Sequence, residues 1–332
     1  MAATIMLVDA DALKSSEWKR FLQNQGYKVL EVETGKTAIQ RCPEVKPDLV
    51  LLNSVLPDIP GFQVCKRLKA DPMNRLMPVI MVSGHSDVEP FAADRAYQSG
   101  ADDFWSKPAS RWEALNRIET ILQLKSYIDQ QAEQVLFTLA HSIESKTPML
   151  TGHSERLCEY TVQFGEHLGL GTEEIEVLRA GSLLHDIGKV SVPDSIVLKP
   201  DKLSIQEMLI MQRHPIVGEE ICAPLKSFRH LLPLIRHHHE RTDGSGYPDG
   251  LMGDAIPLSA QILQMADIFD ALTTDRPYRK ALPVETAMAI MHQETSQGLL
   301  SQKLFREFSI FIWATKPWKD CREMILGNSK PN

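Results

Sequence analysis

The stretch "RWEALNRIETILQLKSYIDQQAEQVLFTLAHSIES", residues 111–145, divides this chain of 332 residues into two parts with different patterns. It contains neither Gly nor Pro, and its apolar residues recur every three or four positions, which predicts one long helix. Before it, short apolar runs alternate with amphipathic segments. After it, the pattern is helical except for a Gly- and Pro-rich loop at 242–257. We therefore expect two domains of different classes, joined by this helix.

One face of the predicted helix is apolar over most of its length. At a 3,4 spacing it carries Ile118, Ile121, Lys125, Ile128, Ala132, Val135 and Leu139, with the lysine as a polar interruption. Such a face predicts either pairing with the same helix of a second chain, which would make a homodimer, or packing against the chain's own domains. The sequence favours neither alternative.

The part before residue 108 has the pattern of a parallel α/β sheet. Buried strands are predicted at "TIMLVD" (4–9), "YKVLEV" (27–32) and "PDLVLLNSV" (47–55), and amphipathic helices at "SSEWKRFLQNQ" (15–25) and "GFQVCKRLKA" (61–70). Short β-rich runs that alternate with helices indicate βαβ units, whose sheet is covered by helices on both faces.

The strand ends of this part resemble the receiver domain of response regulators, over residues 3–122. The resemblance is carried by "TIMLVD", "PDLVLLN", "VSG" and "WSKP". It implies a doubly wound sheet of five parallel strands, with an acidic pair that holds a divalent cation and an Asp that accepts a phosphoryl group. Asp9, Ser83 and Lys107 match the family's positions, whereas Ala10 replaces the second acid and Asn53 stands at the phospho-acceptor position; Asp11 lies one place later.

The Asn at the acceptor position removes the chemistry of a phosphorylated switch. An amide lacks the nucleophilic carboxylate oxygen that would form an acyl phosphate, so the chain has no phospho-acceptor. The loss of one carboxylate beside Asp9 also weakens a site for a hard cation. We expect a pseudo-receiver that dimerises or docks a signalling protein partner.

The part after residue 140 contains imidazole and carboxylate groups at helix-length intervals. The potential metal ligands are His153, His185, Asp186, His214, His238, His239 and Asp267. Successive groups are separated by 24 to 32 residues, so that each comes from a different helix or helix end. Helical bundles build metal sites from inward side chains of facing helices, and we expect such a site here.

The ligand types indicate which ions this site would take. Imidazole and carboxylate without thiolate fit Fe, Mn, Co, Ni or Zn rather than a structural zinc site. "HDIGK" (185–189) lies in an apolar stretch, which we interpret as a helix, and Asp186 could bridge ions held by two sets of histidines. Two such ions would activate a water molecule and clamp a phosphodiester. Lys189, three residues after Asp186, is placed to meet the substrate phosphate, and the loop at 242–257 presents Tyr247 to the same pocket.

These motifs resemble the HD-GYP family of bacterial cyclic di-GMP phosphodiesterases, over about residues 140–308. The resemblance is carried by "HSERL", "LLHDIGKVSVPDSIVLKPDKL" and "HHERTDGSGYPDGLMGDAIPLSAQILQMADIFDALTTDRPYRKAL". It implies that the seven potential ligands bind metal, that Asp186 and Lys189 are catalytic, and that Lys189 polarises the scissile phosphate. Tyr247 becomes the tyrosine of the GYP motif, and Arg276 and Arg279 contact substrate phosphate or guanine. Asp270, one turn after Asp267, is expected to orient a histidine or a backbone group.

Two positions depart from the family pattern. Some members carry a Glu four residues before the first ligand, where it recruits a third metal, but this chain has Met149 there. An acid is also common six residues before that ligand, where this chain has Thr147. We therefore expect two metal ions and a complete set of ligands for them.

Composition excludes several other classes of protein. A net charge of −7 argues against a DNA-binding protein, and no apolar run approaches the roughly 20 residues of a membrane-spanning helix. The start, "MAATIMLVDA", lacks the basic residues of a signal peptide, and the five cysteines form no CxxC pair, which indicates reduced thiols in the cytoplasm.

The sequence thus predicts an α/β receiver-like domain at 1–122, a connecting helix at 111–145 and an all-α HD-GYP domain at 140–332. The expected activity is hydrolysis of cyclic di-GMP to linear pGpG by a binuclear centre; the sequence leaves open whether a second cut to GMP follows. A different class of function remains open, in which the domain binds cyclic di-GMP as a sensor and acts through protein contacts. Hydrolysis of another cyclic nucleotide by the same metals is a third alternative.

Overall fold

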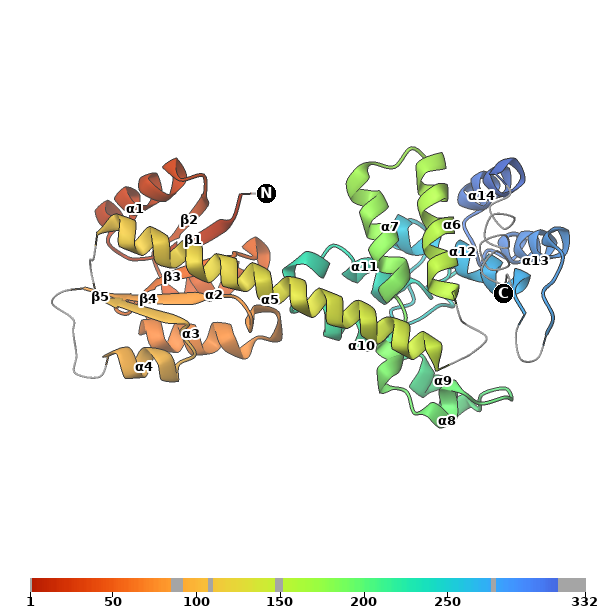
Figure 1. Ribbon diagram of the computed structural model, residues 1–332, viewed down its shortest axis with the longest axis horizontal. Coiled ribbons are helices and arrows are strands. Elements are labelled where there is room, and N and C mark those ends of the chain that lie inside the picture. Colours follow the sequence, from red (N-terminus) through yellow and green to blue (C-terminus); the bar gives the residue numbers. More distant parts are fainter. Residues whose placement is uncertain (1, 85–91, 107–109, 147–151, 276–278, 316–332) are drawn as a thin grey trace, which may run out of the picture. The chain divides into compact units, whose positions relative to one another are not determined.

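The computed structural model describes residues 2–84, 92–106, 110–146, 152–275 and 279–315 (Figure 1). The chain divides into two compact units, Met1–Ala132 and Glu133–Asn332. The first unit is α/β and the second is all-α, as the sequence predicts.

The first unit is built on a sheet of five parallel strands. Their bounds are Thr4–Val8 (β1), Lys28–Val32 (β2), Leu49–Asn53 (β3), Val79–Ser83 (β4) and Asp103–Ser106 (β5). The strand order is β2-β1-β3-β4-β5, and every neighbouring pair is parallel. This is the doubly wound order of receiver domains, whose sites lie at the carboxyl ends of the strands.

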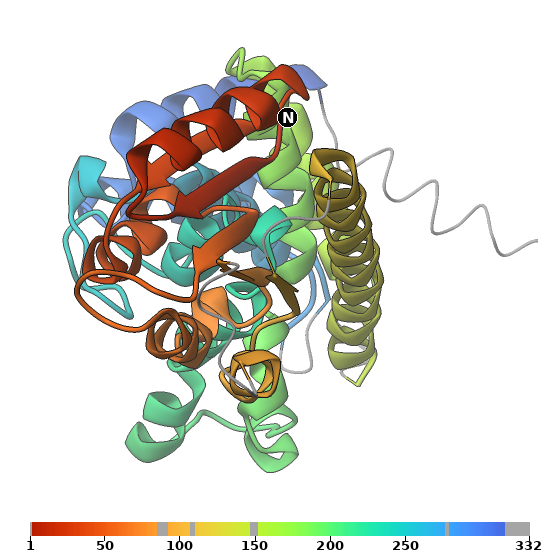
Figure 2. The same ribbon diagram turned by 90° about the vertical axis from the view of Figure 1, so that its left-hand side faces the viewer.

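Helices cover both faces of this sheet (Figures 1 and 2). One face is covered by α1 (Ala12–Asn24) and α5 (Arg111–Ser145). The other face is covered by α2 (Gly35–Val45), α3 (Gly61–Ala70) and α4 (Ala92–Gln98). A short 3₁₀ turn, η1 (Pro72–Asn74), precedes β4. The alternation of β1 supplies both cores, because Ile5 and Leu7 pack with α1 and α5 while Met6 and Val8 pack with α2 and α3.

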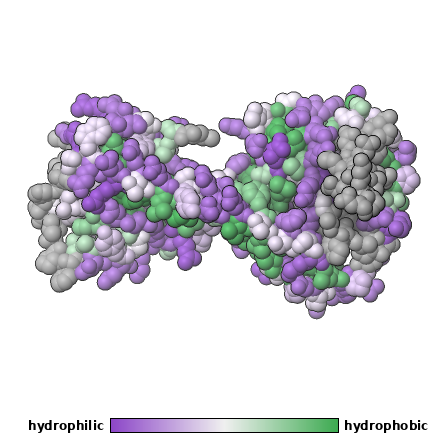
Figure 3. All heavy atoms as spheres, viewed as in Figure 1, coloured by the Kyte–Doolittle hydropathy of each residue, from purple (hydrophilic) through white to green (hydrophobic). Residues whose placement is uncertain are grey.

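Helix α5 begins in the first unit and ends in the second, with 35 residues. On the predicted apolar face, Ile118 is fully buried and Ile121 packs beside it in the core of the first unit, which confirms packing against its own domain for this part. Further along, Ile128 and Val135 are 45% and 64% exposed, and green side chains interrupt the purple surface along the helix (Figure 3). Pairing with a second chain stays a prediction for this exposed part.

The second unit consists of helices and short 3₁₀ turns. After the end of α5 come α6 (His153–His167), α7 (Thr172–Leu184), η3 (Ile187–Ser191), α8 (Asp194–Val197), α9 (Ile205–Met211), α10 (His214–Cys222), η4 (Lys226–Phe228), α11 (Leu232–His237), η5 (Gly253–Ala255), α12 (Leu258–Thr273), α13 (Val284–Ser296) and α14 (Gln302–Thr315). Phe164, Phe269, Phe308 and Phe311 are fully buried and join α6, α12 and α14 through edge-on and tilted ring contacts. This aromatic core holds α6 and α12, two helices that carry potential ligands.

Within the described residues, none of the helices has the length and apolar character needed to cross a membrane. The longest helix, α5, is interrupted by charged residues throughout.

Candidate metal centre

The pair His185 and Asp186 lies at the end of a helix, not inside one. Helix α7 ends at Leu184, His185 is its C-cap, and Asp186 leaves the helical region with φ −96° and ψ 6° before η3 begins. The prediction that the pair lies within an apolar helix was wrong for this reason. The turn instead brings His185 Nε2 to 3.3 Å from Asp186 Oδ2.

Three buried histidines are anchored in the same way. Each ring places Nδ1 near the carbonyl oxygen of the residue three positions earlier: His185 near Ser182 (2.8 Å), His214 near Met211 (2.8 Å) and His238 near Ile235 (2.7 Å). A carbonyl can only accept, so each Nδ1 carries the proton and donates it. In the neutral form of each ring, the Nε2 atom then keeps a lone pair, which is the state of a metal ligand.

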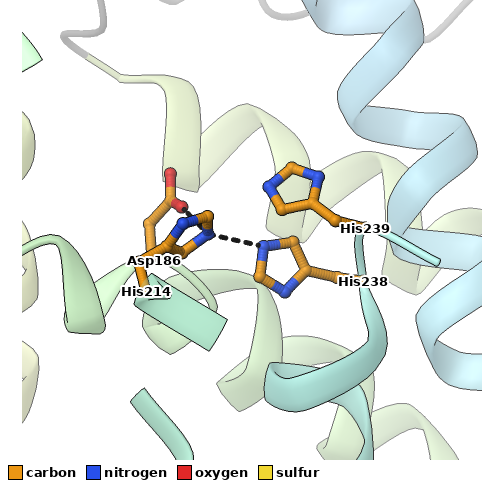
Figure 4. Close-up of side chains that lie close together, drawn as sticks. All are labelled: Asp186, His214, His238 and His239. Carbon is orange, nitrogen blue, oxygen red and sulfur yellow. Dashed lines mark hydrogen bonds and ion pairs between the residues drawn. The ribbon is translucent and has the colours of Figure 1, made fainter. Parts of the chain in front are cut away.

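The free nitrogens converge on one another. His214 Nε2 lies 3.2 Å from His238 Nε2, and these rings come from the start of α10 and the end of α11 (Figure 4). Two nitrogens that both lack a proton cannot form a hydrogen bond, and their lone pairs repel. A cation that accepts both lone pairs removes this conflict.

Asp186 stands between two groups of ligands. One group joins it to His214, His238 and His239, and the other joins it to His153 and His185, with the ligand atoms of each group within 4.8 Å of one another. Its Oδ1 lies 3.3 Å from His214 Nε2, whereas its Oδ2 lies near His185. Each oxygen thus faces a different set of histidines.

His153, the first residue of α6, is held from its far side by α12. Its Nδ1 lies 2.7 Å from Asp270 Oδ2, and the same carboxylate accepts from Arg156 Nε at 2.7 Å. The expectation that Asp270 orients a histidine is confirmed by this contact. His153 Nε2 points instead toward Asp267, 3.5 Å from its Oδ1.

The loop after His239 is fixed to the centre by Glu240. This side chain is fully buried, and its carboxylate accepts backbone N–H groups of Asp249 (2.7 Å), Gly250 (3.1 Å) and Leu251 (3.0 Å). Tyr247 is thereby held over the His239 ring, with centroids 4.8 Å apart. Gly246 is required where the loop folds back, because a Cβ there would stand 2.3 Å from the backbone nitrogen of Arg241.

The other predicted substrate contacts differ in their surroundings. Lys189 Nζ lies 2.5 Å from Asp186 Oδ2, so it reaches the centre through that carboxylate. Arg279 donates to the carbonyl oxygens of Ala271 (2.6 Å) and Leu272 (3.1 Å), at the end of α12. Arg276, Thr147 and Met149 lie outside the described residues.

Burial sets the protonation of the centre. Burial lowers the pKa of His214 to about 4 and holds the pKa values of His238 and His239 well below their usual range. Burial alone would raise the pKa of Asp186, but Lys189 and His185 outweigh it and hold that pKa well below the usual range. His214, His238 and His239 are therefore neutral imidazoles beside an ionised Asp186 at neutral pH, whereas the neighbouring carboxylate of Asp186 raises the pKa of His185 against its burial.

The residues present fit divalent transition-metal ions. Asp186 Oδ1 is buried and has no hydrogen-bond partner among the described residues, and a buried ionised oxygen in that state is costly unless a cation neutralises it. Neutral imidazoles and one shared carboxylate are the donors that Fe, Mn, Co, Ni and Zn accept. His153, His185, His214, His238, His239 and Asp186 would hold the metal, with Asp267 beside His153.

The corresponding site of the first unit has different chemistry. Asn53, at the end of β3, donates from Nδ2 to Asp9 Oδ1 at 2.9 Å, and its Oδ1 accepts from the Val55 N–H at 3.2 Å. Asp11 donates its backbone N–H to Asp9 as well, and Ser83 is buried at the end of β4. The amide at position 53 thus bonds directly to the remaining acid; Lys107 lies outside the described residues.

Sequence reasoning did not identify three polar residues that support the centre: Glu144, Arg156 and Glu240. Glu144 and Glu240 are buried, and Arg156 pairs with Asp270 across 114 positions of sequence. Glu240 directly follows the two histidines, so its place in "HHE" was the available signal. Arg156 stands in the "HSERL" motif, whereas Glu144 belongs to none of the quoted motifs.

Comparison with known proteins adds an independent finding. A model of the HD domain matches residues 138–302, and a model of the response regulator receiver domain matches residues 5–119. The cyclic di-GMP phosphodiesterase response regulator RpfG of Xanthomonas campestris is 35% identical over 280 residues, which cover 77% of this chain and 74% of that one. A cyclic di-GMP phosphodiesterase of Thermotoga maritima is 30% identical over 86% of this chain and 84% of its own length. A 3'3'-cGAMP-specific phosphodiesterase of Vibrio cholerae is 40% identical over 165 residues, half of this chain and 36% of that protein.

Proposed function

Since the chain belongs to the response regulators that join a receiver domain to an HD domain of the HD-GYP type, we propose that it is a metal-dependent phosphodiesterase acting on cyclic di-GMP. The observation that carries the proposal is the placement of Asp186, whose two oxygens face two separate groups of histidine nitrogens. The Xanthomonas and Thermotoga relatives, which both align with most of the chain, are named for this activity.

The centre is proposed to be binuclear. One ion would be held by Asp186, His214, His238 and His239, and the other by Asp186, His153 and His185, with Asp267 completing the second set. Two such ions supply an activated water for in-line attack and neutralise charge on the phosphate.

Other residues of the chain are proposed to contact the phosphate and the guanine of the substrate. Lys189, paired with Asp186, supplies a positive charge to the phosphate, and Tyr247 and His239 offer adjacent ring faces on which a guanine can stack. Arg276 and Arg279 are proposed as further contacts to phosphate or guanine. Burial and nearby carboxylates raise the pKa of Tyr247, so that its phenol stays protonated and can donate a hydrogen bond.

The proposed reaction adds one water to one phosphodiester. Water attacks phosphorus, the bond to a ribose 3' oxygen breaks, and that oxygen receives the proton. The first product is linear pGpG with a 5'-phosphate, and a second cut of the same kind gives GMP.

The test is hydrolysis of cyclic di-GMP by protein loaded separately with Fe(II), Mn(II) or Zn(II), with metal content measured on the same samples. The His185→Ala, Asp186→Ala double variant should lose both metal and turnover. Tight binding of cyclic di-GMP by fully loaded protein without turnover would instead establish a sensor.

The same assay should also test 3'3'-cGAMP as a substrate. The Vibrio cholerae relative named for 3'3'-cGAMP aligns with the half of this chain that carries the centre. A panel of cyclic di-GMP, 3'3'-cGAMP and cyclic di-AMP, compared by kcat/KM, decides between them. Cyclic di-GMP is expected to give the highest value.

The first unit is proposed to act as a pseudo-receiver, through assembly rather than phosphorylation. The bond from Asn53 to Asp9 supports this, because the acceptor position holds an amide. The exposed Ile128 and Val135 of α5 support a homodimer as the assembled form. Sedimentation of the full chain should show a dimer that the Ile128→Glu, Val135→Glu double variant weakens.

A further inference from the structure

Helix α6, which begins with the ligand His153, is capped by a residue of another helix. Glu144, near the end of α5, is buried with 8% of its surface exposed. Its Oε1 accepts the backbone N–H of His153 at 2.7 Å and that of Ser154 at 3.3 Å. These are the first two N–H groups of α6, which no turn of the helix itself can satisfy.

The usual cap of a helix start is missing at this place. The N-cap residue of α6 is Gly152, with φ 74°, and it makes no side-chain cap bond. A Ser, Thr or Asn at an N-cap position ordinarily accepts an N–H group of the first turn through its own side chain, without burying a charge. The second oxygen of Glu144 is buried without a hydrogen-bond partner among the described residues, so this arrangement has a cost that a local cap would avoid.

His153 is consequently fixed at two points. Glu144 holds its backbone from α5, and Asp270 holds its ring nitrogen from α12. The direction of the remaining ring nitrogen, Nε2, depends on both anchors. A ligand atom that shifts by a fraction of an ångström loses metal affinity, and outer partners of metal ligands are worth about 10- to 100-fold.

We propose that Glu144 is a positioning residue for the His153 side of the metal centre. Through Glu144, the position of α5 would be coupled to the metal affinity of that side. The proposal rests on the binuclear centre described above. Because α5 starts in the receiver unit, Glu144 is the point at which a shift of this helix would reach a metal ligand directly. In the other group, the rings of His214 and His238 are anchored by the carbonyl oxygens of Met211 and Ile235, which lie outside α5, so we expect these ligands to keep their metal affinity.

The first test measures Mn²⁺ binding by calorimetry and elemental analysis, without any nucleotide. Glu144→Ala should bind Mn²⁺ at the His153 side about 10- to 100-fold more weakly, while the other side keeps its affinity. Glu144→Gln keeps an oxygen acceptor of the same reach and should regain the second ion at saturating Mn²⁺. Glu133→Ala changes a carboxylate roughly three turns earlier on the same helix and should bind as the wild type does.

The second test uses the reciprocity of coupled equilibria. If Glu144 ties α5 to metal binding, Mn²⁺ must slow hydrogen exchange of the α5 amides at 137–145 in the wild-type chain and must not do so in Glu144→Ala. A role in stability alone would leave the Mn²⁺ effect the same in both proteins.

Three results would overturn the proposal. They are an equal loss of affinity on both sides of the centre, no loss on either, or the same protection of α5 by Mn²⁺ in both chains. None of these readouts requires turnover. A wild-type chain that shows the coupling but does not hydrolyse cyclic di-GMP would refute the proposed activity and leave this inference standing.

Discussion

Gly188 lies against His214 so closely that a Cβ on Gly188 would stand 1.9 Å from the His214 carbonyl oxygen. The contact joins η3, which follows Asp186, to the first residue of α10, and Gly218 on the next turn of α10 faces the same glycine. The meeting of these two backbones brings Asp186 and His214, two proposed ligands from separate segments, within 3.3 Å of one another. The glycine of "HDIGK", Gly188, is therefore required for the close approach of the two segments that carry Asp186 and His214.

Substitution Gly188→Ala should push α10 away and separate His214 from Asp186. We expect about a 10- to 100-fold loss of metal affinity, measured by competition with a chelating dye, and a matching loss of activity. Gly171→Ala is the control, since its Cβ would meet only Glu174 Oε2 at 3.7 Å. Unchanged metal affinity in Gly188→Ala would show that the backbones can separate without moving the ligands.

Asp270→Asn should lower stability in a pH-dependent way. Burial would raise the pKa of Asp270, but His153 and Arg156 outweigh it and lower that pKa to about 2, from an ordinary value of 3.8. The group therefore contributes about 2 kcal/mol that is fully present above pH 4 and is lost as the pH falls toward 2. Urea denaturation at pH 7, 5, 4 and 3 measures the free energy of unfolding of both proteins. The wild type should exceed the variant by the full amount at pH 7 and 5, and by a decreasing amount at pH 4 and 3. A difference that stays constant to pH 3 would contradict the assignment.

Removal of metal should make the protein sensitive to mild acid. Burial lowers the pKa of His214 to about 4, whereas in the unfolded chain a histidine titrates near 6.5. The unfolded state then binds more protons between these values, so stability falls as the pH drops below about 6.5, by about 3 kcal/mol from this group alone. Thermal melts with chelator at pH 8, 7, 6 and 5 measure the slope, which His214→Gln should reduce. A flat profile would count against a neutral buried imidazole.

Glu240→Gln should loosen the loop that carries Tyr247. A glutamine keeps one acceptor oxygen but turns an amide donor toward the N–H of Leu251, so we expect a loss of about 1–3 kcal/mol. KM for the nucleotide should rise while metal content stays at the wild-type level, which separates a loop effect from a metal effect. Glu173→Gln, an exposed carboxylate in the first turn of α7, is the matched control. Loss of metal in Glu240→Gln would instead indicate that Glu240 positions the neighbouring ligand His239.

The receiver unit should not accept a phosphoryl group. Incubation with acetyl phosphate and Mg²⁺ should give no phosphoryl adduct in the intact-mass spectrum of the wild-type chain. Asn53→Asp would replace a donor 2.9 Å from Asp9 by a second carboxylate, and should lower the Tm in the absence of Mg²⁺. A stable adduct on the wild-type chain would refute the pseudo-receiver.

The elements of the fold follow from local pattern to a large extent. The range 61–70 predicted for the third helix agrees with α3, Gly61–Ala70, and the connecting helix was expected where α5 runs, because apolar periodicity and helix breakers act locally. The seven potential ligands were also readable, since chemically distinctive residues stand out one by one. Periodicity failed at His185 and Asp186, because the end of α7 depends on a single residue in a non-helical conformation rather than on composition.

The sequence identified Asp270 as a residue that orients a histidine or a backbone group, but it showed neither which partner Asp270 contacts nor that Arg156 and Glu144 support the centre. Asp270 stands 117 residues after His153, and its partner Arg156 precedes it by 114. Nothing in the run around Glu144 distinguishes a helix cap from a solvated charge, because the contact exists only when α5 and α6 are brought together. Long-range hydrogen bonds of this kind need the folded backbone before they can be recognised.

The hydrogen bond from Asn53 to Asp9 also decides how the metal content of this protein can be counted. A receiver with its full acidic cluster binds Mg²⁺ and would add a second population of bound ion to any titration. Here an amide hydrogen replaces that cation beside Asp9, so no ion is needed to neutralise a carboxylate pair. Stoichiometry measured on the whole chain thus reports the histidine cluster alone, and an isotherm with two equal steps would arise entirely from the second unit.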